Sequence, residues 1–545
     1  MKAHLLDRGR NFEWKWALVA AAEREGSRTG RRYQRAPDFD PRAGLPWNAE
    51  ALTADLALTT LFSAMGRDDD CVFEVVRKVI LTGVSGDLET IRYRQEILQD
   101  CLNHPAVVRE LYSVAVEANE KRRGHYLGFL SRHPDSVLRD ALETMATLLD
   151  FLRALRRIAD VHAERFSSEG WTTFFSMVRR DLDDEYFDGV QSHLEALRFR
   201  TGELISAKVG KGNKGRDYVL HRAPYRKWTL WDWWTGLFQE KSPAYRFELA
   251  PRDEAGAQAL NELRNRGISL AANALGQAAD HVRDFFSMLR AELAFYIGCL
   301  NLHEQLARKG EPTCVPSPAP SSERRLSCRG LYDVGLTLTV EPRVVGNDAN
   351  ADGKDLVVIT GPNTGGKSTF LRSVGLAQLM MQCGMFVPAE SFSASLCDGL
   401  VTHYKREEDV SMASGKFDEE LSRMSDIVDH IAPYSMILFN ESFGATNERE
   451  GSEIARQIIS ALLENRVRTL FVTHMYELAH GFYQRSMRNA LFLRAGRQAD
   501  GSRTFKLLVG EPLPTSFGED LYNAIFGAKI DHSEAVRRQA VAGAP

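Results

Sequence analysis

Nine consecutive residues, GPNTGGKST at 361–369, have the types and spacing needed to hold phosphate groups. They follow an apolar run, Leu356–Ile359, and precede a helical pattern that starts near Phe370. In a strand–loop–helix unit of this kind, the backbone N–H groups of the glycine-rich loop and the N-terminus of the helix face the phosphates. The lysine reaches the β- and γ-phosphates, and the hydroxyl of the next residue binds Mg²⁺. The sequence therefore predicts a site for ATP and Mg²⁺, formed by Gly361, Pro362, Asn363, Thr364, Gly365, Gly366, Lys367, Ser368 and Thr369.

Two later strand-like runs end in polar residues suited to hydrolysis. The run at 435–439 is followed by Asn440 and Glu441, and the run at 470–472 is followed by Thr473 and His474. A carboxylate at Glu441 can orient and polarise an attacking water, and His474 can contact the γ-phosphate or hold that water. Asn440 offers Mg²⁺ an oxygen without the charge of an aspartate, which predicts weaker metal binding. Each strand end alone would be an ordinary turn, but the upstream phosphate loop favours the catalytic interpretation.

Bulk properties limit the class of protein. The chain has 545 residues and a net charge of −4, so it is long enough for several domains, and its overall charge does not indicate a nucleic-acid binder. Its seven cysteines form no CxxC pair, which favours reduced thiols. Neither a signal sequence nor an apolar run of membrane-spanning length is evident. We expect a cytoplasmic protein that is not embedded in a membrane.

The pattern along the chain predicts a multidomain α and α/β protein. Residues from about 51 to 200 are helical in pattern, and a single long helix is expected over about 257–308. Apolar strand-like runs then alternate with helices, as in an α/β domain. The expected divisions are an N-terminal arm without assigned structure (1–50), a helical core and lever (51–310) with a small β-containing insertion (about 200–250), a Pro/Ser-rich linker (311–328) and the α/β domain (329–545).

The insertion is predicted to be a basic β-hairpin. Leu204–Val209 and Tyr218–Leu220 read as strands around a glycine-rich turn. Seven cations and one acid, Asp217, lie between positions 208 and 227, a balance that predicts salt-sensitive, sequence-independent contacts with DNA phosphates. The alternative is a solvated basic loop, and the tryptophans at 228–234 are expected to pack in a core rather than to stack on bases. The candidate DNA contacts are Lys208, Lys211, Lys214 and Arg216.

Four ordered motifs resemble the MutS family of DNA mismatch-repair ATPases. Thr360–Thr369 looks like the family's TGPN-x-GGKST loop, with Thr364 where the family usually has Met. Gly384–Ala389 is similar to the segment after the loop helix, Val472–Leu478 resembles the ATHxxEL motif, and Ser516–Gly518 resembles the C-terminal SxG element. The resemblance is strong over about 329–530 and weaker over about 50–310.

The resemblance implies an ABC-type ATPase head that works as a dimer, with ATP between the subunits. The segment that faces the partner's nucleotide would be the one at 411–417, where Ser411 or Ser414 supplies a hydroxyl or Lys416 a charge, and the choice among them stays open. Val344 and Asn347 stand where the family contacts adenine, with Val344 in place of a frequent aromatic. Since the family usually has Asp where this chain has Asn440, slow hydrolysis is expected.

The function implied is an ATP-dependent clamp on double-stranded or branched DNA, a homodimer with possible repair-protein partners, in mismatch repair or related recombination. The roughly 50 residues before the helical core are too few for the family's mismatch-reading and connector domains, which favours relatives that clamp branched DNA. One alternative is a nucleotide-gated scaffold that binds ATP and scarcely hydrolyses it, as Asn440 suggests. Another, an ABC-type protein with coiled-coil arms, is disfavoured because heptads do not flank the head on both sides.

Overall fold

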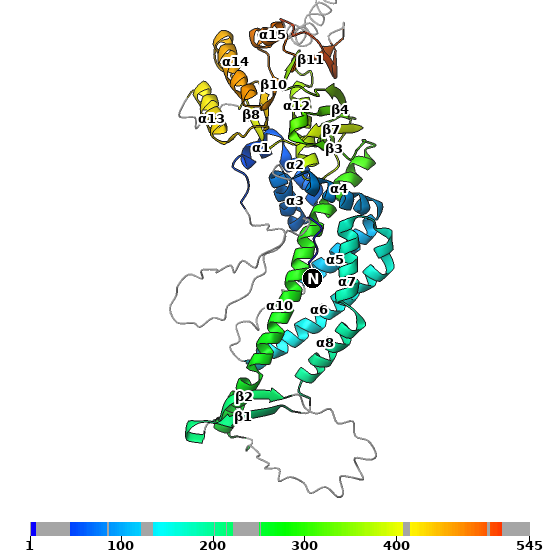
Figure 1. The fold of residues 1–545 in the computed structure, drawn as a ribbon, viewed down its shortest axis with the longest axis vertical. Coiled ribbons are helices and arrows are strands. Elements are labelled where there is room, and N and C mark those ends of the chain that lie inside the picture. Colours follow the sequence, from blue (N-terminus) through cyan, green and yellow to red (C-terminus); the bar gives the residue numbers. More distant parts are fainter. Residues whose placement is uncertain are drawn as a thin grey trace, which may run out of the picture.

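The structure is a computed structural model that describes residues 2–6, 44–83, 87–120, 134–200, 202–213, 215–221, 250, 252–406, 415–498 and 502–514. It is elongated, with an α/β head at one end, a helical shaft, and a β-hairpin at the other end (Figure 1). Several residues predicted to be functional or structural lie outside the described residues: Lys214, the tryptophans at 228–234, Ser411, Ser414 and the SxG element at 516–518.

The shaft is built on one helix, α10 (Glu254–Arg308), which confirms the long helix expected from the sequence. Its 55 residues span about 80 Å, and Asp253 caps its first turn by accepting from the N–H of Gly256. The helix packs mainly on α6, α5, α3 and α2. Helix α1 (Ala49–Asp55) lies at the junction with the head, where it contacts β8 (Leu400–Tyr404) (Figure 1). The other shaft helices are α2 (Leu58–Gly66), α3 (Asp70–Thr82), α4 (Leu88–Asn103), α5 (Pro105–Glu120), α6 (Pro134–His162), α7 (Glu169–Asp181) and α8 (Asp184–Leu197).

By its length and composition alone, helix α10 could cross a membrane. However, 83% of its most apolar window is buried inside the protein. Residues such as Phe286, Leu289 and Leu293 are fully buried against the neighbouring helices. Its apolar character is therefore accounted for by the core of the shaft.

A hairpin caps the far end of the shaft, as the sequence predicts. Strand β1 (Leu204–Val209) pairs antiparallel with β2 (Gly215–His221), and the register shifts between Ser206 and Lys208. The hairpin packs directly on α10, because a Cβ built on Gly267 would lie 2.4 Å from Cδ1 of Ile205. A small cluster around Ile268 and Leu220 closes this contact.

The head contains two sheets. The larger has the order β12-β11-β6-β10-β9-β8 and is parallel except for the antiparallel edge strand β12. Its strands are β6 (Leu356–Thr360), β8 (Leu400–Tyr404), β9 (Met436–Asn440), β10 (Arg468–Val472), β11 (Ala490–Arg497) and β12 (Arg503–Val509). The head helices are α11 (Val334–Thr339), α12 (Lys367–Gln382), α13 (Lys416–His430), α14 (Glu448–Glu464) and α15 (Tyr476–Gln484).

The smaller sheet corrects the prediction of a linker at 311–328. It has the order β3-β7-β4-β5, with β3 (Ser317–Ala319), β4 (Leu326–Leu331), β5 (Asn347–Asn350) and β7 (Ser391–Ser395). Strand β3 lies in the supposed linker, β4 begins in it, and both pair with β7. Proline is tolerated at such short edge strands, so the Pro/Ser-rich composition did not prevent strand formation.

Residues 2–6 lie at the junction of shaft and head, although no structure was predicted for this segment. Leu5 and Leu6 are buried, and both of their backbone N–H groups donate to Oε2 of Glu292 on α10, at 2.5 and 3.3 Å. The carbonyl of Leu6 accepts from Nε of Arg94 at 2.7 Å, and the same guanidinium reaches the carbonyl of Cys383, at the end of α12, at 3.5 Å. One arginine thus links the N-terminal segment to the end of the helix that follows the glycine-rich loop.

Candidate active site

The glycine-rich loop at 361–366 joins β6 to α12 and depends on glycine at two points. Gly361 has φ +119° and Gly366 has φ +88°, conformations that side chains disfavour. A Cβ on Gly361 would also lie 2.8 Å from the backbone nitrogen of Ala495 on β11. The loop therefore places backbone N–H groups without covering side chains at the N-terminus of the buried helix α12. Such an arrangement can bind phosphate.

Lys367 is folded into this loop. Its Nζ donates to the carbonyl of Gly361 at 3.1 Å and to that of Pro362 at 2.9 Å. The residue is 5% exposed, and burial lowers the pKa of its amine to about 8. An ammonium at this position can reach the phosphate oxygens of a nucleotide that the loop would hold.

Ser368 and Asn440 meet at the first turn of α12. The hydroxyl of Ser368 donates to Oδ1 of Asn440 at 2.7 Å. A hydroxyl and an amide oxygen are both hard ligands of the kind that Mg²⁺ accepts, and phosphate and water complete such a shell. No group of three or more His, Cys, Asp or Glu side chains that could hold a metal occurs in the part of the chain that the structure describes. The pair therefore fits Mg²⁺ only together with a nucleotide, and with less charge than an aspartate would supply.

Glu441 and His474 also come together, as their positions after adjacent strands predict. Strands β9 and β10 are parallel and pair Asn440 with Val472, so the residues that follow lie at the same edge of the sheet. Nε2 of His474 lies 2.9 Å from Oε1 of Glu441. The hydrogen bond from His474 is the main cause of a lowered pKa at Glu441, against the opposing effect of burial. Glu441 is therefore an ionised carboxylate at neutral pH, suited to orienting water.

The two residues proposed for the adenine side have different surroundings. Val344 is half-buried at the edge of the core. Asn347 is buried, its amide nitrogen donates to the carbonyl of Phe505 at 3.1 Å, and its Oδ1 accepts from the N–H of Leu507 at 2.8 Å. Its amide thus holds β12 in place beside the loop, a supporting position that the sequence did not indicate.

Sequence reasoning missed Phe505. This residue is 47% exposed and has φ +55°, which is rare for a bulky side chain. Its Cα and carbonyl oxygen lie 3.6 Å from the position of a Cβ on Gly366, so it stands directly beside the loop. On the same strand, Arg503 donates to the carbonyl of Asn363 at 3.3 Å. The local pattern of residues 503–509 does not predict that Phe505 lies beside the glycine-rich loop. Its position there depends on how β12 pairs with β11.

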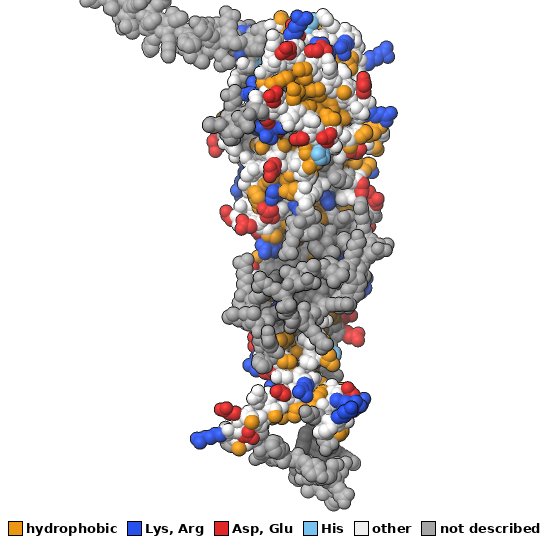
Figure 2. Space-filling model, turned by 90° about the vertical axis from the view of Figure 1, so that its left-hand side faces the viewer, with side chains coloured by type: hydrophobic (Ala, Val, Ile, Leu, Met, Phe, Trp, Pro, Cys, Tyr) orange, Lys and Arg blue, Asp and Glu red, His pale blue; other side chains and the backbone are white. Residues whose placement is uncertain are grey.

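The remaining predicted residues lie elsewhere. Lys416 is the first residue of α13 and is half-buried. Helix α13 follows β8, the edge strand of the large sheet, whereas the glycine-rich loop follows β6 in the interior of that sheet. At the opposite end of the molecule, Lys208, Lys211 and Arg216 are exposed on the hairpin, and both Lys208 and Arg216 lie near Asp217, at 3.5 and 3.9 Å. Cationic side chains are prominent at this end in Figure 2.

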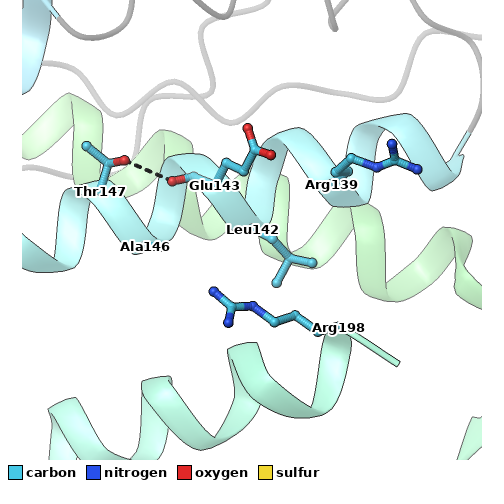
Figure 3. Close-up of a pocket in the computed structure, with 6 residues that line it drawn as sticks. All are labelled: Arg139, Leu142, Glu143, Ala146, Thr147 and Arg198. Carbon is cyan, nitrogen blue, oxygen red and sulfur yellow. Dashed lines mark hydrogen bonds between the residues drawn. The ribbon is translucent and has the colours of Figure 1, made fainter. Parts of the chain in front are cut away.

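A cavity of about 500 Å³ lies on the shaft rather than at the loop. It is lined by Arg139, Leu142, Glu143, Ala146, Thr147 and Arg198, from α6 and the end of α8 (Figure 3). None of these residues was predicted to be functional. The cavity has no part in the constellation at the head.

Comparisons with known proteins give the family. A model described as "MutS2 N-terminal domain" matches residues 86–309, and one described as "MutS domain V" matches residues 357–521. The chain belongs to the MutS family. The second match contains the loop and both polar strand ends, and the first runs from the start of α4 to the end of α10. At the level of the family, this places the MutS-family chain among mismatch-repair proteins that bind ATP and DNA.

Individual relatives resemble part of the chain. "DNA mismatch repair protein MutS" of Porphyromonas gingivalis is 31% identical over 213 residues, 35% of this chain and 24% of that protein. "MutS protein homolog 4" of Mus musculus is 28% identical over 240 residues, 43% of this chain and 24% of that protein. This chain thus covers about a quarter of the length of these relatives.

Proposed function

We propose that this MutS-family chain is a DNA-binding ATPase that couples ATP binding and hydrolysis to the state of a DNA clamp. The observation that carries the proposal is the convergence of five predicted residues at one edge of the large sheet: Lys367, Ser368, Asn440, Glu441 and His474. Phosphate binding, metal binding and water activation each have a side chain there.

Each side chain has a distinct role in this proposal. The loop at 361–369 and Lys367 hold the phosphates. When Mg²⁺ is bound it would neutralise phosphate charge, and Ser368 and Asn440 would hold it. Glu441 orients the attacking water, and His474 fixes the carboxylate and faces the γ-phosphate. Val344 contributes an apolar contact to the base, and Phe505 offers an aromatic face beside the loop.

The DNA-binding part of the proposal rests on the far end of the molecule. Lys208, Lys211, Lys214 and Arg216 would contact backbone phosphates of double-stranded or branched DNA. We propose a cytoplasmic homodimer with repair-protein partners, in which Ser411, Ser414 or Lys416 faces the partner's nucleotide. We also propose a helical core and lever over 51–310, with the clamp-like insertion at about 200–250, and an ATPase domain over 329–545.

The test is a filter-binding assay on duplex, mismatched, flap and four-way-junction DNA, with and without ATP. Lys367→Ala should abolish nucleotide binding or the effect of ATP on DNA binding. Lys354→Ala is a matched control, since Lys354 binds the carbonyl of Arg488 away from the loop. If Lys367→Ala responds to ATP like the wild type, the assignment is wrong.

Asn440 supports a second candidate, a nucleotide-gated scaffold that binds ATP and scarcely hydrolyses it. The amide supplies an oxygen to Mg²⁺ without a negative charge. The two candidates differ in one measurement, steady-state ATP turnover, with Glu441→Gln as the background control. Turnover at the level of that control, together with ATP-dependent DNA binding, favours the scaffold.

The buried amine of Lys367 predicts a pH dependence of nucleotide binding. Its pKa is lowered to about 8 in the free protein, and a bound polyphosphate raises the pKa by favouring the charged form. Affinity is therefore fully present below pH about 8 and should fall as pH rises through that value, by up to tenfold per pH unit. Binding at pH 8.5 should take up a proton, which calorimetry in buffers of different ionisation enthalpy would detect. Lys367→Arg, which stays charged, should remove the proton uptake.

A further inference from the structure

The backbone that carries Glu441 is strained. Glu441 has φ +56° and Phe443 has φ +63°, and neither is glycine. Such conformations are unfavourable for residues other than glycine and persist only where the surroundings hold them. The turn from 441 to 443 therefore needs partners that fix it.

Two fully buried polar residues on other elements supply those partners. The N–H of Phe443 donates to Oε2 of Glu420 on α13 at 2.8 Å. The hydroxyl of Ser442 lies 2.7 Å from Nδ1 of His403 on β8 and 2.5 Å from the carbonyl of His403. The ring of Phe443 stacks on the imidazole with centroids 5.3 Å apart.

His403 and Glu420 are also bound to each other. Nε2 of His403 donates to the carbonyl of Glu420 at 3.0 Å, so Nδ1 of the neutral ring carries no proton. The single proton of the Ser442 hydroxyl is therefore shared between the carbonyl of His403 and Nδ1. Burial lowers the pKa of His403 to about 4, so the ring is neutral and keeps this tautomer. The result is a continuous chain of hydrogen bonds from α13 through β8 to the turn that follows Glu441.

We infer that His403 and Glu420 are positioning residues that hold Glu441 in the geometry for hydrolysis and make that geometry depend on the position of α13. The inference rests on the proposed function and assigns two residues to it. Both are 0% exposed, and the atoms they bind belong to the turn at 442–443 and to each other. Because α13 begins at Lys416, about one helical turn before Glu420, a shift of its N-terminal turn would change the position of the catalytic carboxylate through these hydrogen bonds.

The test compares three variants by single-turnover and steady-state kinetics. Glu420→Ala removes the acceptor for Phe443, and Ser442→Ala removes only the hydroxyl. We expect kcat to fall about 10- to 100-fold in both, with KM for ATP within about twofold of wild type, as for interactions that act on the chemical step alone. Glu420→Gln keeps an acceptor oxygen in the same place and should restore kcat to within a few-fold.

A matched control addresses stability. Ser435→Ala removes a buried hydroxyl that precedes the same strand, β9, and should leave kcat unchanged. If Glu420→Ala does not fold, Ser442→Ala against Ser435→Ala still decides the question. Wild-type kcat in folded Ser442→Ala, a parallel change in KM, or a Glu420→Gln variant as slow as Glu420→Ala would overturn the inference. A wild-type chain without turnover would instead overturn the proposed function and this inference with it.

Discussion

The Glu441→Gln variant is expected to bind ATP as tightly as the wild-type chain and to hydrolyse it at least about 100-fold more slowly, the usual range for loss of a positioned base. The reason lies in the charge of the side chain. His474 donates to the carboxylate at 2.9 Å and lowers its pKa, so Glu441 is ionised at neutral pH and can polarise water. The amide keeps the acceptor for His474 and loses the charge. Rapid-quench measurement of a single turnover separates this step from binding.

Asn440→Asp is the informative companion to Glu441→Gln. It adds a charge 2.7 Å from the hydroxyl of Ser368 and leaves Glu441 unchanged, so turnover should rise and the Mg²⁺ concentration for half-maximal rate should fall. A Glu441→Gln variant with wild-type turnover would show that this carboxylate is not the catalytic one. Equal turnover in Asn440→Asp and wild type would show that the missing charge does not slow hydrolysis.

The site was predictable where its signals are local in sequence. The loop, Lys367 and Ser368 lie in one run, and the polar residues after β9 and β10 follow apolar strands. Parallel pairing then brings such strand ends together, so Glu441 and His474 meet as expected. The long helix and the hairpin were also predictable, because periodicity of 3.6 and alternation around a glycine-rich turn are properties of neighbouring residues.

What could not be predicted depends on contacts between distant residues. The N-terminal segment is held by Glu292, 287 residues away from Leu5, and no local pattern of Ala3 to Leu6 indicates that partner. Strand β3, and β4 that begins at Leu326, form because they pair with β7, and β4 also pairs with β5. Phe505 and His403 likewise gain their positions from sheet register. Local composition favoured a linker at 311–328 and gave no structure at all for the start of the chain.

The triple variant Lys208→Ala, Lys211→Ala, Arg216→Ala should lose most of the salt-dependent affinity for DNA. These side chains are exposed on the hairpin, at the far end of the shaft that is built on α10. Helix α10 is about 80 Å long. Each phosphate contact contributes about 0.9 to the slope of log K against log salt concentration, so the slope should fall by up to about 2.7. Binding of duplex DNA measured by anisotropy between 50 and 200 mM salt gives this slope directly.

The control for this variant must remove equal charge elsewhere. Arg308, Arg329 and Arg343 are exposed cations outside the hairpin, with side chains 70, 74 and 70% exposed. Their replacement by alanine changes the net charge by the same amount and should leave the salt slope within about 0.5 of wild type, since a slope counts contacted phosphates rather than net charge. If both triple variants lower the slope equally, the hairpin is a solvated basic loop. If only the hairpin variant does so, and ATP turnover is unchanged without DNA, then DNA binding and hydrolysis reside at opposite ends of the molecule and must be coupled through the shaft.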